Sequence, residues 1–258
     1  MSTPASPAVW FSVPVPNAQA PTRVICVPYA GAGASVYHAW ARALAPAGIE
    51  ARAVQLPGRE NRLRDAPFTA MAPLINALAD QVAPWTDRPY VLFGHSMGAL
   101  VCFELVRELR RRRRPLPVTL YVSGATAPQV GRDEAALHTL PDDALVQEVS
   151  RRYQGIPAQV LEHWELLDLV LPALRADLTV METYTYAAEP PLPCAITALS
   201  GTGDARVTAE KIAPWGALTA SAFTTQWFDG DHFFLHDHRD AIVNRLRARS
   251  EEHTSELQ

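Results

Sequence analysis

The sequence predicts an α/β domain whose mostly parallel central sheet is flanked by helices on both faces. Along the first half of the chain, four short apolar runs alternate with three longer segments of helical periodicity. The apolar runs are residues 23–27, 49–56, 90–93 and 118–124, and the helical segments are residues 35–46, 71–85 and 97–113. Strands in this alternation pair in parallel, because each helix returns the chain to the same edge of the sheet.

Length and composition favour one large domain and exclude several classes of protein. The chain has 258 residues, of which 48% are hydrophobic, so a substantial core is available. The net charge of −4 gives no reason to expect nucleic acid or an anionic membrane as a partner. We find no apolar run of about 18 residues and no signal-peptide pattern, so we expect no membrane partner and a cytoplasmic location.

The three cysteines are too scattered for a disulfide framework or a metal site. Cys26, Cys102 and Cys194 each lie in an apolar run. We therefore expect buried, unreactive thiols, no metal and no cofactor.

The alternation of strands and helices stops after Ala125. Residues 126–189 contain helical segments but no convincing strand, and strands are predicted again at residues 194–201 and 222–228. A helical insertion between two strands of one sheet indicates a lid over the sheet edge. We therefore expect a single domain with a helical lid at about residues 126–189.

The C-terminal region is divided into a last helix and a polar tail. A final helix is predicted at residues 239–247, so the domain is expected to span residues 1–248. The remaining stretch RSEEHTSELQ, residues 249–258, is polar and has no helical period. We interpret it as a non-native tail that lies outside the fold.

The stretch GHSMG, residues 94–98, joins a predicted strand to a predicted helix. A G-x-S-x-G pattern in this context is typical of a nucleophilic serine, because the sharp turn exposes its hydroxyl and the glycines allow close backbone approach. The helix N-terminus next to Ser96 supplies N–H groups that stabilise negative charge. A serine that only caps the helix is the alternative interpretation.

A nucleophilic serine needs a base, and the base needs an orienting acid. Asp204 follows the strand predicted at residues 194–201, and His232 follows the strand predicted at residues 222–228. Both therefore lie at the same sheet edge as Ser96, in the chain order expected of a Ser-Asp-His triad.

Other histidines and aspartates near these positions are weaker candidates. We expect His95 to point away from the serine because of the sharp turn, and His236 and His238 to lie on the final helix as surface or capping residues. Asp229 and Asp231 are too close to the base in sequence to face its ring easily.

The glycine-rich stretch PYAGAG, residues 28–33, follows the first predicted strand. It lacks the patterns of a dinucleotide or P-loop site, so it does not predict phosphate binding. We expect this loop to turn a backbone N–H toward Ser96, where it would form an oxyanion hole together with the N–H of Met97. A simple glycine-rich turn is the alternative.

Six motifs, taken together and in order, resemble those of the type II thioesterases. The motifs are PYAGAG, LPGRE, GHSMGA, LPALRADL, SGTGD and GDHFFL. This family consists of stand-alone α/β-hydrolases that accompany polyketide synthases and nonribosomal peptide synthetases. The resemblance implies the α/β-hydrolase fold, with Ser96 as nucleophile, Asp204 as acid and His232 as base. It also implies that the N–H groups of Ala30 and Met97 form the oxyanion hole.

The resemblance covers residues 10–247 and implies a substrate class. Members of the family hydrolyse acyl groups from the phosphopantetheine thiol of acyl or peptidyl carrier domains, which clears stalled or misprimed chains. The implied partner is thus a carrier domain, and we expect a monomer. PYAGAG differs slightly from the commoner PYAGGG form, and Ala34–Tyr37 is also unusual.

Two further patterns have both a structural and a functional interpretation. The arginine run Arg110–Arg114 ends a predicted helix, where cations suit the helix dipole, and it could also dock an acidic carrier domain. The apolar helical pattern at residues 165–186 suits packing within the lid, and the same faces could line an acyl pocket.

Two alternative functions fit the same residues. A small-molecule carboxylesterase or lipase would use the same triad, because the triad does not separate oxygen esters from thioesters. A binding protein on a hydrolase fold would need no triad, yet all three residue types are present. The sequence does not specify the acyl chain or the partner synthase.

Overall fold

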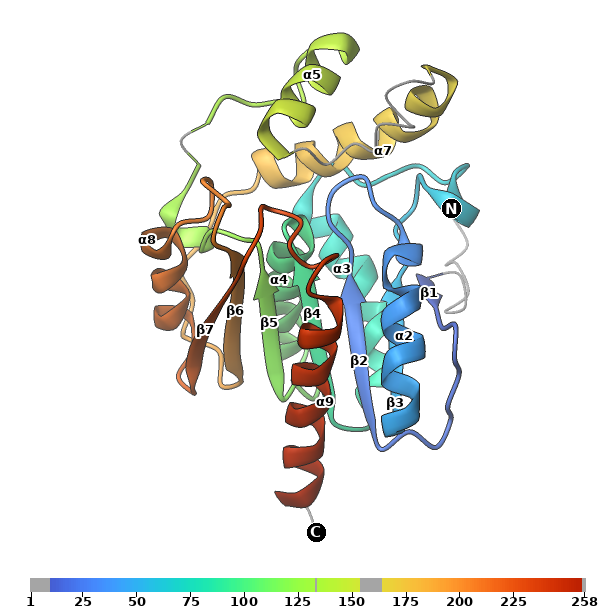
Figure 1. The fold of residues 1–258 in the computed structure, drawn as a ribbon, viewed down its shortest axis with the longest axis vertical. Helices are drawn as coiled ribbons and strands as arrows, with labels where there is room; N and C mark the ends of the chain where they lie inside the picture. Colours follow the sequence, from blue (N-terminus) through green and yellow to red (C-terminus); the bar gives the residue numbers. More distant parts are fainter. Residues whose placement is uncertain (1–9, 133, 154–163, 257–258) are drawn as a thin grey trace.

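The computed structural model describes residues 10–132, 134–153 and 164–256, and Figure 1 shows their fold. Seven strands in these residues form one sheet in the order β1-β3-β2-β4-β5-β6-β7. They are β1 (Phe11–Ser12), β2 (Thr22–Val27), β3 (Ile49–Val54), β4 (Tyr90–His95), β5 (Thr119–Ser123), β6 (Ala195–Gly201) and β7 (Phe223–Phe228). Neighbouring strands are parallel except β1 and β3, which are antiparallel. The predicted parallel sheet is confirmed. Strand β1 was not predicted, because two residues are too few to show the alternation typical of a strand.

The helices follow the predicted alternation. The α-helices described are α2 (His38–Leu44), α3 (Met71–Val82), α4 (Met97–Arg111), α5 (Asp142–Tyr153), α7 (Trp164–Glu182), α8 (Ala209–Ile212) and α9 (Arg239–Glu256). The segment predicted as one helix at residues 35–46 is composite, since 3₁₀ turns flank α2 on both sides. Gly48 then ends it with a φ of 73°, in the left-handed region that glycine favours.

Two hydrophobic clusters pack on opposite faces of the sheet. In β4, Tyr90 and Leu92 pack with α3 and α4 on one face, whereas Val91 and Phe93 pack with α2 and α9 on the other. This is the alternation that a strand buried on both faces requires. Helices cover both faces of the sheet, as Figure 1 shows. A site can therefore form at the edge where the carboxyl ends of the strands lie.

Helices α5 and α7 lie above that edge, between β5 and β6 in the chain (Figure 1). They have an apolar cluster of their own, formed by Leu137, Leu145, Val149, Leu167, Leu171, Leu174 and Leu178. Ala30, from the PYAGAG loop, packs against this cluster. The apolar face of α7 is thus used largely for packing between the two helices and against that loop.

A buried ion pair ties α7 to two loops at the sheet edge. The guanidinium of Arg59 donates two hydrogen bonds to the carboxylate of Asp177, at 2.5 and 2.8 Å. The same carboxylate accepts the backbone N–H of Gly31 at 2.8 Å, and Arg59 also donates to the carbonyl of Ala32 at 3.1 Å. Three of the motifs, PYAGAG, LPGRE and LPALRADL, therefore meet at one point.

We predict that Arg59→Met lowers the free energy of unfolding by about 3–5 kcal/mol, because it leaves the buried Asp177 carboxylate without its charged partner. Urea denaturation followed by circular dichroism measures the change. Arg111→Met is the matched control, since the Arg111 side chain is 46% exposed and its ion pairs are worth about 0–1 kcal/mol each. Equal losses in the two variants would contradict the prediction.

A second buried carboxylate fixes the chain that leads from β5 to α5. Glu182, at the end of α7, accepts the backbone N–H groups of Leu137 and His138 at 2.9 and 3.0 Å. It also contacts the His138 ring nitrogen Nδ1 at 2.6 Å. The C-terminal half of α7 is therefore held at two points, Asp177 and Glu182.

The end of the last helix differs from the prediction. We expected the helix to stop near Arg247, but α9 continues to Glu256. Residues 248–256 contain neither proline nor glycine and include arginine and glutamates, which propagate a helix once it has formed. The origin of residues 249–258 as a non-native tail stays an interpretation. No helix in the described part of the chain is long and apolar enough to cross a bilayer.

Candidate active site

Ser96 occupies a strained turn between β4 and α4. Its φ and ψ are 52° and −115°, a conformation that non-glycine residues rarely adopt. Its backbone N–H donates to the carbonyl of Ser123 on β5 at 2.8 Å. His95 and Met97 on either side are fully buried, whereas Ser96 is half-buried and lines a cavity. The turn thus presents this residue alone to the cavity.

The two glycines of GHSMG are required by close backbone contacts. A Cβ atom on Gly94 would lie 2.1 Å from the carbonyl oxygen of Gly98. A Cβ atom on Gly98 would lie 2.2 Å from the carbonyl oxygen of Val27 on β2. Any larger residue would therefore push α4 away from the sheet, as the sequence pattern predicted.

Asp204 and His232 form a buried pair at the same sheet edge. The Asp204 carboxylate accepts a hydrogen bond from Nδ1 of the His232 ring, with 2.6 Å between the atoms. Its other oxygen accepts the N–H of Arg206 at 3.0 Å. Burial raises the pKa of the Asp204 carboxyl, but the hydrogen bond and charge of His232 outweigh this and hold the pKa below its ordinary value. The carboxylate is therefore ionised near neutral pH.

Ser96 and His232 line the same cavity. The described contacts include no hydrogen bond between the Ser96 hydroxyl and the ring of His232. Such bonds are often long until substrate binds, so the shared cavity is the relevant observation.

The weaker candidates have other contacts. Asp231 accepts the N–H of Phe233 at 2.7 Å, and the Asp229 carbonyl accepts a hydrogen bond from His238 at 2.6 Å. His236 is exposed and contacts the Tyr29 hydroxyl at 3.2 Å. Both histidines precede α9, whose first residue is Arg239, so their expected place on the final helix is wrong. The turn after β7 delays the start of that helix.

His95 lies closer to the base than the sequence indicated. Its ring centroid is 5.1 Å from that of His232, and its Nδ1 contacts the Ser123 hydroxyl at 2.9 Å. Burial, followed by the nearby His232 and His236 rings, lowers the pKa of His95 well below its ordinary value. His95 is therefore a neutral ring packed behind His232, because β4 directs its side chain under the turn.

Two further residues, Tyr153 and Arg206, contact the Asp204–His232 pair. The ring of Tyr153, the last residue of α5, lies 5.1 Å from the His232 ring. Its hydroxyl accepts a hydrogen bond from Arg206 at 2.8 Å, and Arg206 also pairs with Glu134 at 2.6 Å. No pattern in the sequence indicated either residue. Tyr153 reaches the site only through the packing of α5, and it meets there the side chain of Arg206, from the loop after β6.

The N–H groups of Ala30 and Met97 are near the serine turn. The loop that contains Ala30 leaves β2 at Val27, whose carbonyl lies against Gly98. Within the described part of the chain, neither N–H donates a hydrogen bond, whereas those of Gly31 and Ala32 do. Both N–H groups are therefore available to another acceptor.

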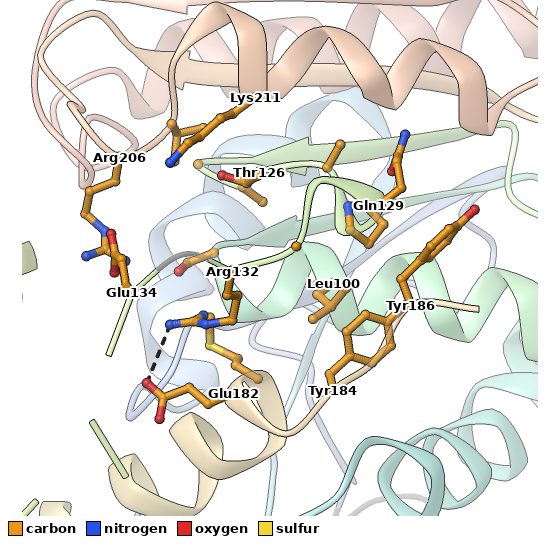
Figure 2. A pocket seen from close by; sticks show the side chains of 18 of the residues that line it. Leu100, Thr126, Gln129, Arg132, Glu134, Glu182, Tyr184, Tyr186, Arg206 and Lys211 are labelled. Atoms are coloured by element: carbon orange, nitrogen blue, oxygen red, sulfur yellow. Dashed lines mark ion pairs between the residues drawn. The ribbon is translucent and has the colours of Figure 1, made fainter. Parts of the chain in front are cut away.

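The cavity above Ser96 has a volume of about 530 Å³. Its walls come mainly from residues 124–132 and Glu134 after β5, residues 181–186 at and after the end of α7, and residues 206–211 after β6. Figure 2 shows charged side chains at one end, including Arg206, Glu134 and Arg132, and Leu100, Tyr184 and Tyr186 at the other. The expected apolar lining by α7 is thus limited to its last turn, at Met181.

The arginine run at the end of α4 is largely paired with acidic residues. Arg110 and Arg111 pair with Glu189 at 2.8 and 2.6 Å, and Arg112 pairs with Glu108 at 2.6 Å. The run also lies a whole helix of 15 residues, or about 22 Å, from Ser96. These contacts favour a structural role for the run over docking.

The chain has the fold of the α/β-hydrolases, as predicted. The features that show this are the order of the strands, the position of the cavity at their carboxyl ends and the strained turn at Ser96. In the described residues, no three His, Cys, Asp or Glu side chains cluster as metal ligands. The groups that line the cavity are a serine hydroxyl and an imidazole–carboxylate pair.

Comparison with known proteins specifies the family. Residues 22–249 match the thioesterase domain family, and the chain belongs to it. It is 39% identical to the gramicidin S biosynthesis protein GrsT of Aneurinibacillus migulanus over 234 residues, 91% of each chain. Among solved structures, the type II thioesterase BorB of the borrelidin biosynthetic cluster has a TM-score of 0.86 and 38% identity, covering 94% of this chain and 98% of that one.

A second solved structure supports the same family assignment. RedJ, the thioesterase of the prodiginine pathway in Streptomyces coelicolor, has a TM-score of 0.83 and 38% identity, covering 96% of this chain and 94% of that one. The resemblance to type II thioesterases is thereby confirmed, and the chain is a hydrolase of the thioesterase class.

Proposed function

We propose that this enzyme hydrolyses acyl thioesters on the phosphopantetheine arm of carrier domains, as an editing type II thioesterase of polyketide or nonribosomal peptide biosynthesis. The observation that carries the proposal is the buried Asp204–His232 pair, which shares one cavity with Ser96 in a chain of the thioesterase family. The names of the relatives, from gramicidin S, borrelidin and prodiginine biosynthesis, support the same setting.

We assign the nucleophile to Ser96 and the base to His232. Nδ1 of His232 donates to Asp204, so Nε2 is free to accept the proton of the Ser96 hydroxyl. The oxygen attacks the thioester carbonyl as the proton moves to the ring. The C–S bond then breaks, the His232 ring gives this proton to the departing sulfur, and the thiol leaves with an ester remaining on Ser96.

Water completes the cycle. His232 removes a proton from a water molecule, which attacks the ester, and the carboxylic acid leaves as Ser96 regains its proton. A thiol has a pKa near about 8.5, so its departure needs little help from an acid. Asp204 stabilises the imidazolium that forms in each half of the cycle.

The developing oxyanion needs donors, and we assign these to the N–H groups of Ala30 and Met97. Both are without an acceptor in the described contacts, and Met97 is the first residue of α4. Its N–H therefore adds the positive end of the helix dipole. Removing one such donor costs about 3–4 kcal/mol of transition-state stabilisation in serine hydrolases.

Helices α5 and α7 act as a lid in this proposal. They cover the sheet edge above Ser96, and Tyr153 and Arg206 contact each other beside His232. Excluding water strengthens the oxyanion contacts, because charges interact more strongly in a low dielectric. We further propose that the enzyme works as a cytoplasmic monomer, with the carrier domain as its partner.

The deciding experiment compares two substrate classes on the purified enzyme. One is an acyl-phosphopantetheine carrier domain, and the other is a p-nitrophenyl ester with the same acyl group. A much higher kcat/KM for the carrier-bound thioester supports the proposal. A preference for the free ester would instead assign the enzyme to the carboxylesterases.

A further inference from the structure

Three other aromatic rings lie around that of His232. The rings of His95 and Phe233 are each 5.1 Å from it, centre to centre, and both belong to the sheet edge, since His95 ends β4 and Phe233 follows the base in the chain. The third ring is that of Tyr153, also 5.1 Å away and tilted by 56°. Tyr153 is the last residue of α5 and therefore belongs to the lid. The lid thus supplies one side of the surroundings of the ring that we assign as the base.

Tyr153 is itself held by the loop that carries the acid. Arg206 comes two residues after Asp204, and its guanidinium donates a hydrogen bond to the Tyr153 hydroxyl at 2.8 Å. The guanidinium also lies over the Tyr153 ring, 4.2 Å from its centre, in a cation–π contact. Through its backbone N–H, Arg206 donates to the Asp204 carboxylate at 3.0 Å. One residue therefore connects the acid to the lid ring that contacts the base.

Glu134 strengthens this attachment from the lid side. Its carboxylate pairs with Arg206 at 2.6 Å and with Arg152, the neighbour of Tyr153 on α5, at 3.3 Å. Arg152 also donates to the carbonyl of Ala135 at 3.0 Å. Figure 2 shows Arg206 and Glu134 side by side at the charged end of the cavity. The end of α5 is therefore fastened to the loop after β6 by a continuous chain of contacts.

The position of the His232 ring depends on more than its bond to Asp204. That bond fixes Nδ1, but a single hydrogen bond leaves the ring able to rock about it. His232 and Tyr153 both line the cavity, so Tyr153 opposes such motion on the cavity side. Reaction rates fall by about a hundredfold when a reacting group is misplaced by about 1 Å. A neighbour that keeps the ring still therefore affects the rate directly.

We propose that Tyr153 is a positioning residue for the base His232, and that Arg206 and Glu134 hold Tyr153 in place. Tyr153 transfers no proton. Its ring keeps Nε2 of His232 directed toward the Ser96 hydroxyl while the acid holds Nδ1. The inference rests on the proposed function, in which His232 is the base, and adds a residue of the lid to that site. The base is then fully oriented only when α5 lies over the sheet edge.

The test measures the reactivity of Ser96 in two ways. One is kcat for an acyl-carrier thioester. The other is the second-order rate constant of labelling by diisopropyl fluorophosphate, a small reagent that needs the base but few other contacts in the cavity. Tyr153→Ala should lower both by about tenfold or more, because the base is no longer held in place. Tyr153→Phe keeps the ring and the cation–π contact, so both rates should return to within about threefold of wild type.

A double variant separates positioning from a direct effect of charge on the acid. Arg206→Met removes the guanidinium but keeps the backbone N–H that Asp204 accepts. It should lower the labelling rate by about fivefold in the wild-type background and cause no further loss in Tyr153→Ala, because coupled residues are not additive. Burial raises the pKa of the Asp204 carboxyl, whereas the His232 ring and Arg206 lower it. Rates are therefore measured at about pH 8, where the carboxyl is ionised with or without Arg206.

Arg151→Met is the matched control. Arg151 lies on the same helix, its side chain is 67% exposed, and it pairs with Glu148, so its labelling rate should equal that of the wild type. A thermal melt confirms that each variant is folded, and Arg206→Met alone decides where Tyr153→Ala does not fold.

The outcomes distinguish this inference from the proposed function. A folded Tyr153→Ala that is labelled at the wild-type rate overturns the inference, even if its KM has risen, because Tyr153 is then only part of the cavity wall. Full additivity of Tyr153→Ala and Arg206→Met overturns the role given to Arg206. A wild type that is not labelled at Ser96 overturns the assignment of the base as well. A wild type that is labelled but prefers the free ester overturns the proposed substrate class and leaves the positioning role intact.

Discussion

Ser96→Ala should lower kcat for thioester hydrolysis by on the order of a million-fold while leaving the fold unchanged. The hydroxyl is the only group removed, and Ser96 makes its structural contact to Ser123 through the backbone N–H, which alanine retains. Single-turnover kinetics with a carrier-bound acyl group measure the loss, and far-UV circular dichroism checks the fold.

Active-site labelling gives an independent measure of the same assignment. A fluorophosphonate should label the wild type at Ser96 and should not label Ser96→Ala. Ser35→Ala is the matched control, since Ser35 is an exposed serine whose hydroxyl contacts the carboxylate of Glu60. Labelling at Ser35, or turnover retained in Ser96→Ala, would remove Ser96 from the mechanism.

Asp204→Asn should lower kcat by about ten-thousand-fold. The amide NH₂ that replaces one carboxylate oxygen would face Nδ1 of His232 and favour the ring tautomer that carries its proton on Nε2. That nitrogen then cannot accept the proton of Ser96. Because the amide has nearly the same shape, we expect the expression level and thermal midpoint to change little compared with the loss of rate.

The acid assignment is checked against a neighbouring carboxylate. Asp229→Asn should leave the rate near the wild-type value, because Asp229 is exposed and its contacts go to Thr202 and His238. If Asp204→Asn kept most of its activity and Asp229→Asn did not, the acid would have to be reassigned. A pH–rate profile of each variant distinguishes loss of the base from a general loss of folding.

Local sequence patterns were sufficient to predict the parallel sheet with its helices, and to predict the candidate site residues that follow the ends of strands. The GHSMG turn is specified by a few adjacent residues, so its geometry follows from the chain itself, as the contacts of Gly94 and Gly98 show. The order of Ser96, Asp204 and His232 along the chain likewise follows from the order of the strands.

The features that were missed depend on packing between distant segments. Tyr153 contacts His232 only because α5 lies over the sheet edge, and no property of its own sequence neighbourhood specifies this. His95 does not line the cavity, in agreement with the expectation that it points away from the serine, but no local pattern indicated that its buried, neutral ring lies beside that of His232. Of the two interpretations of residues 165–186, packing within the lid holds for the leucines of α7, which pack against α5 and the Ala30 loop.

The backbone of Ser96 has a consequence for the evolution of the chain. A φ of 52° at a residue with a side chain costs on the order of 1–3 kcal/mol, a penalty that glycine would largely avoid. Glycine at this position would therefore give a more stable turn and, in the proposed mechanism, an inactive enzyme. The serine at the least comfortable position of the turn marks a trade-off, in which part of the stability of the scaffold is given up to hold the hydroxyl that we assign to the nucleophile.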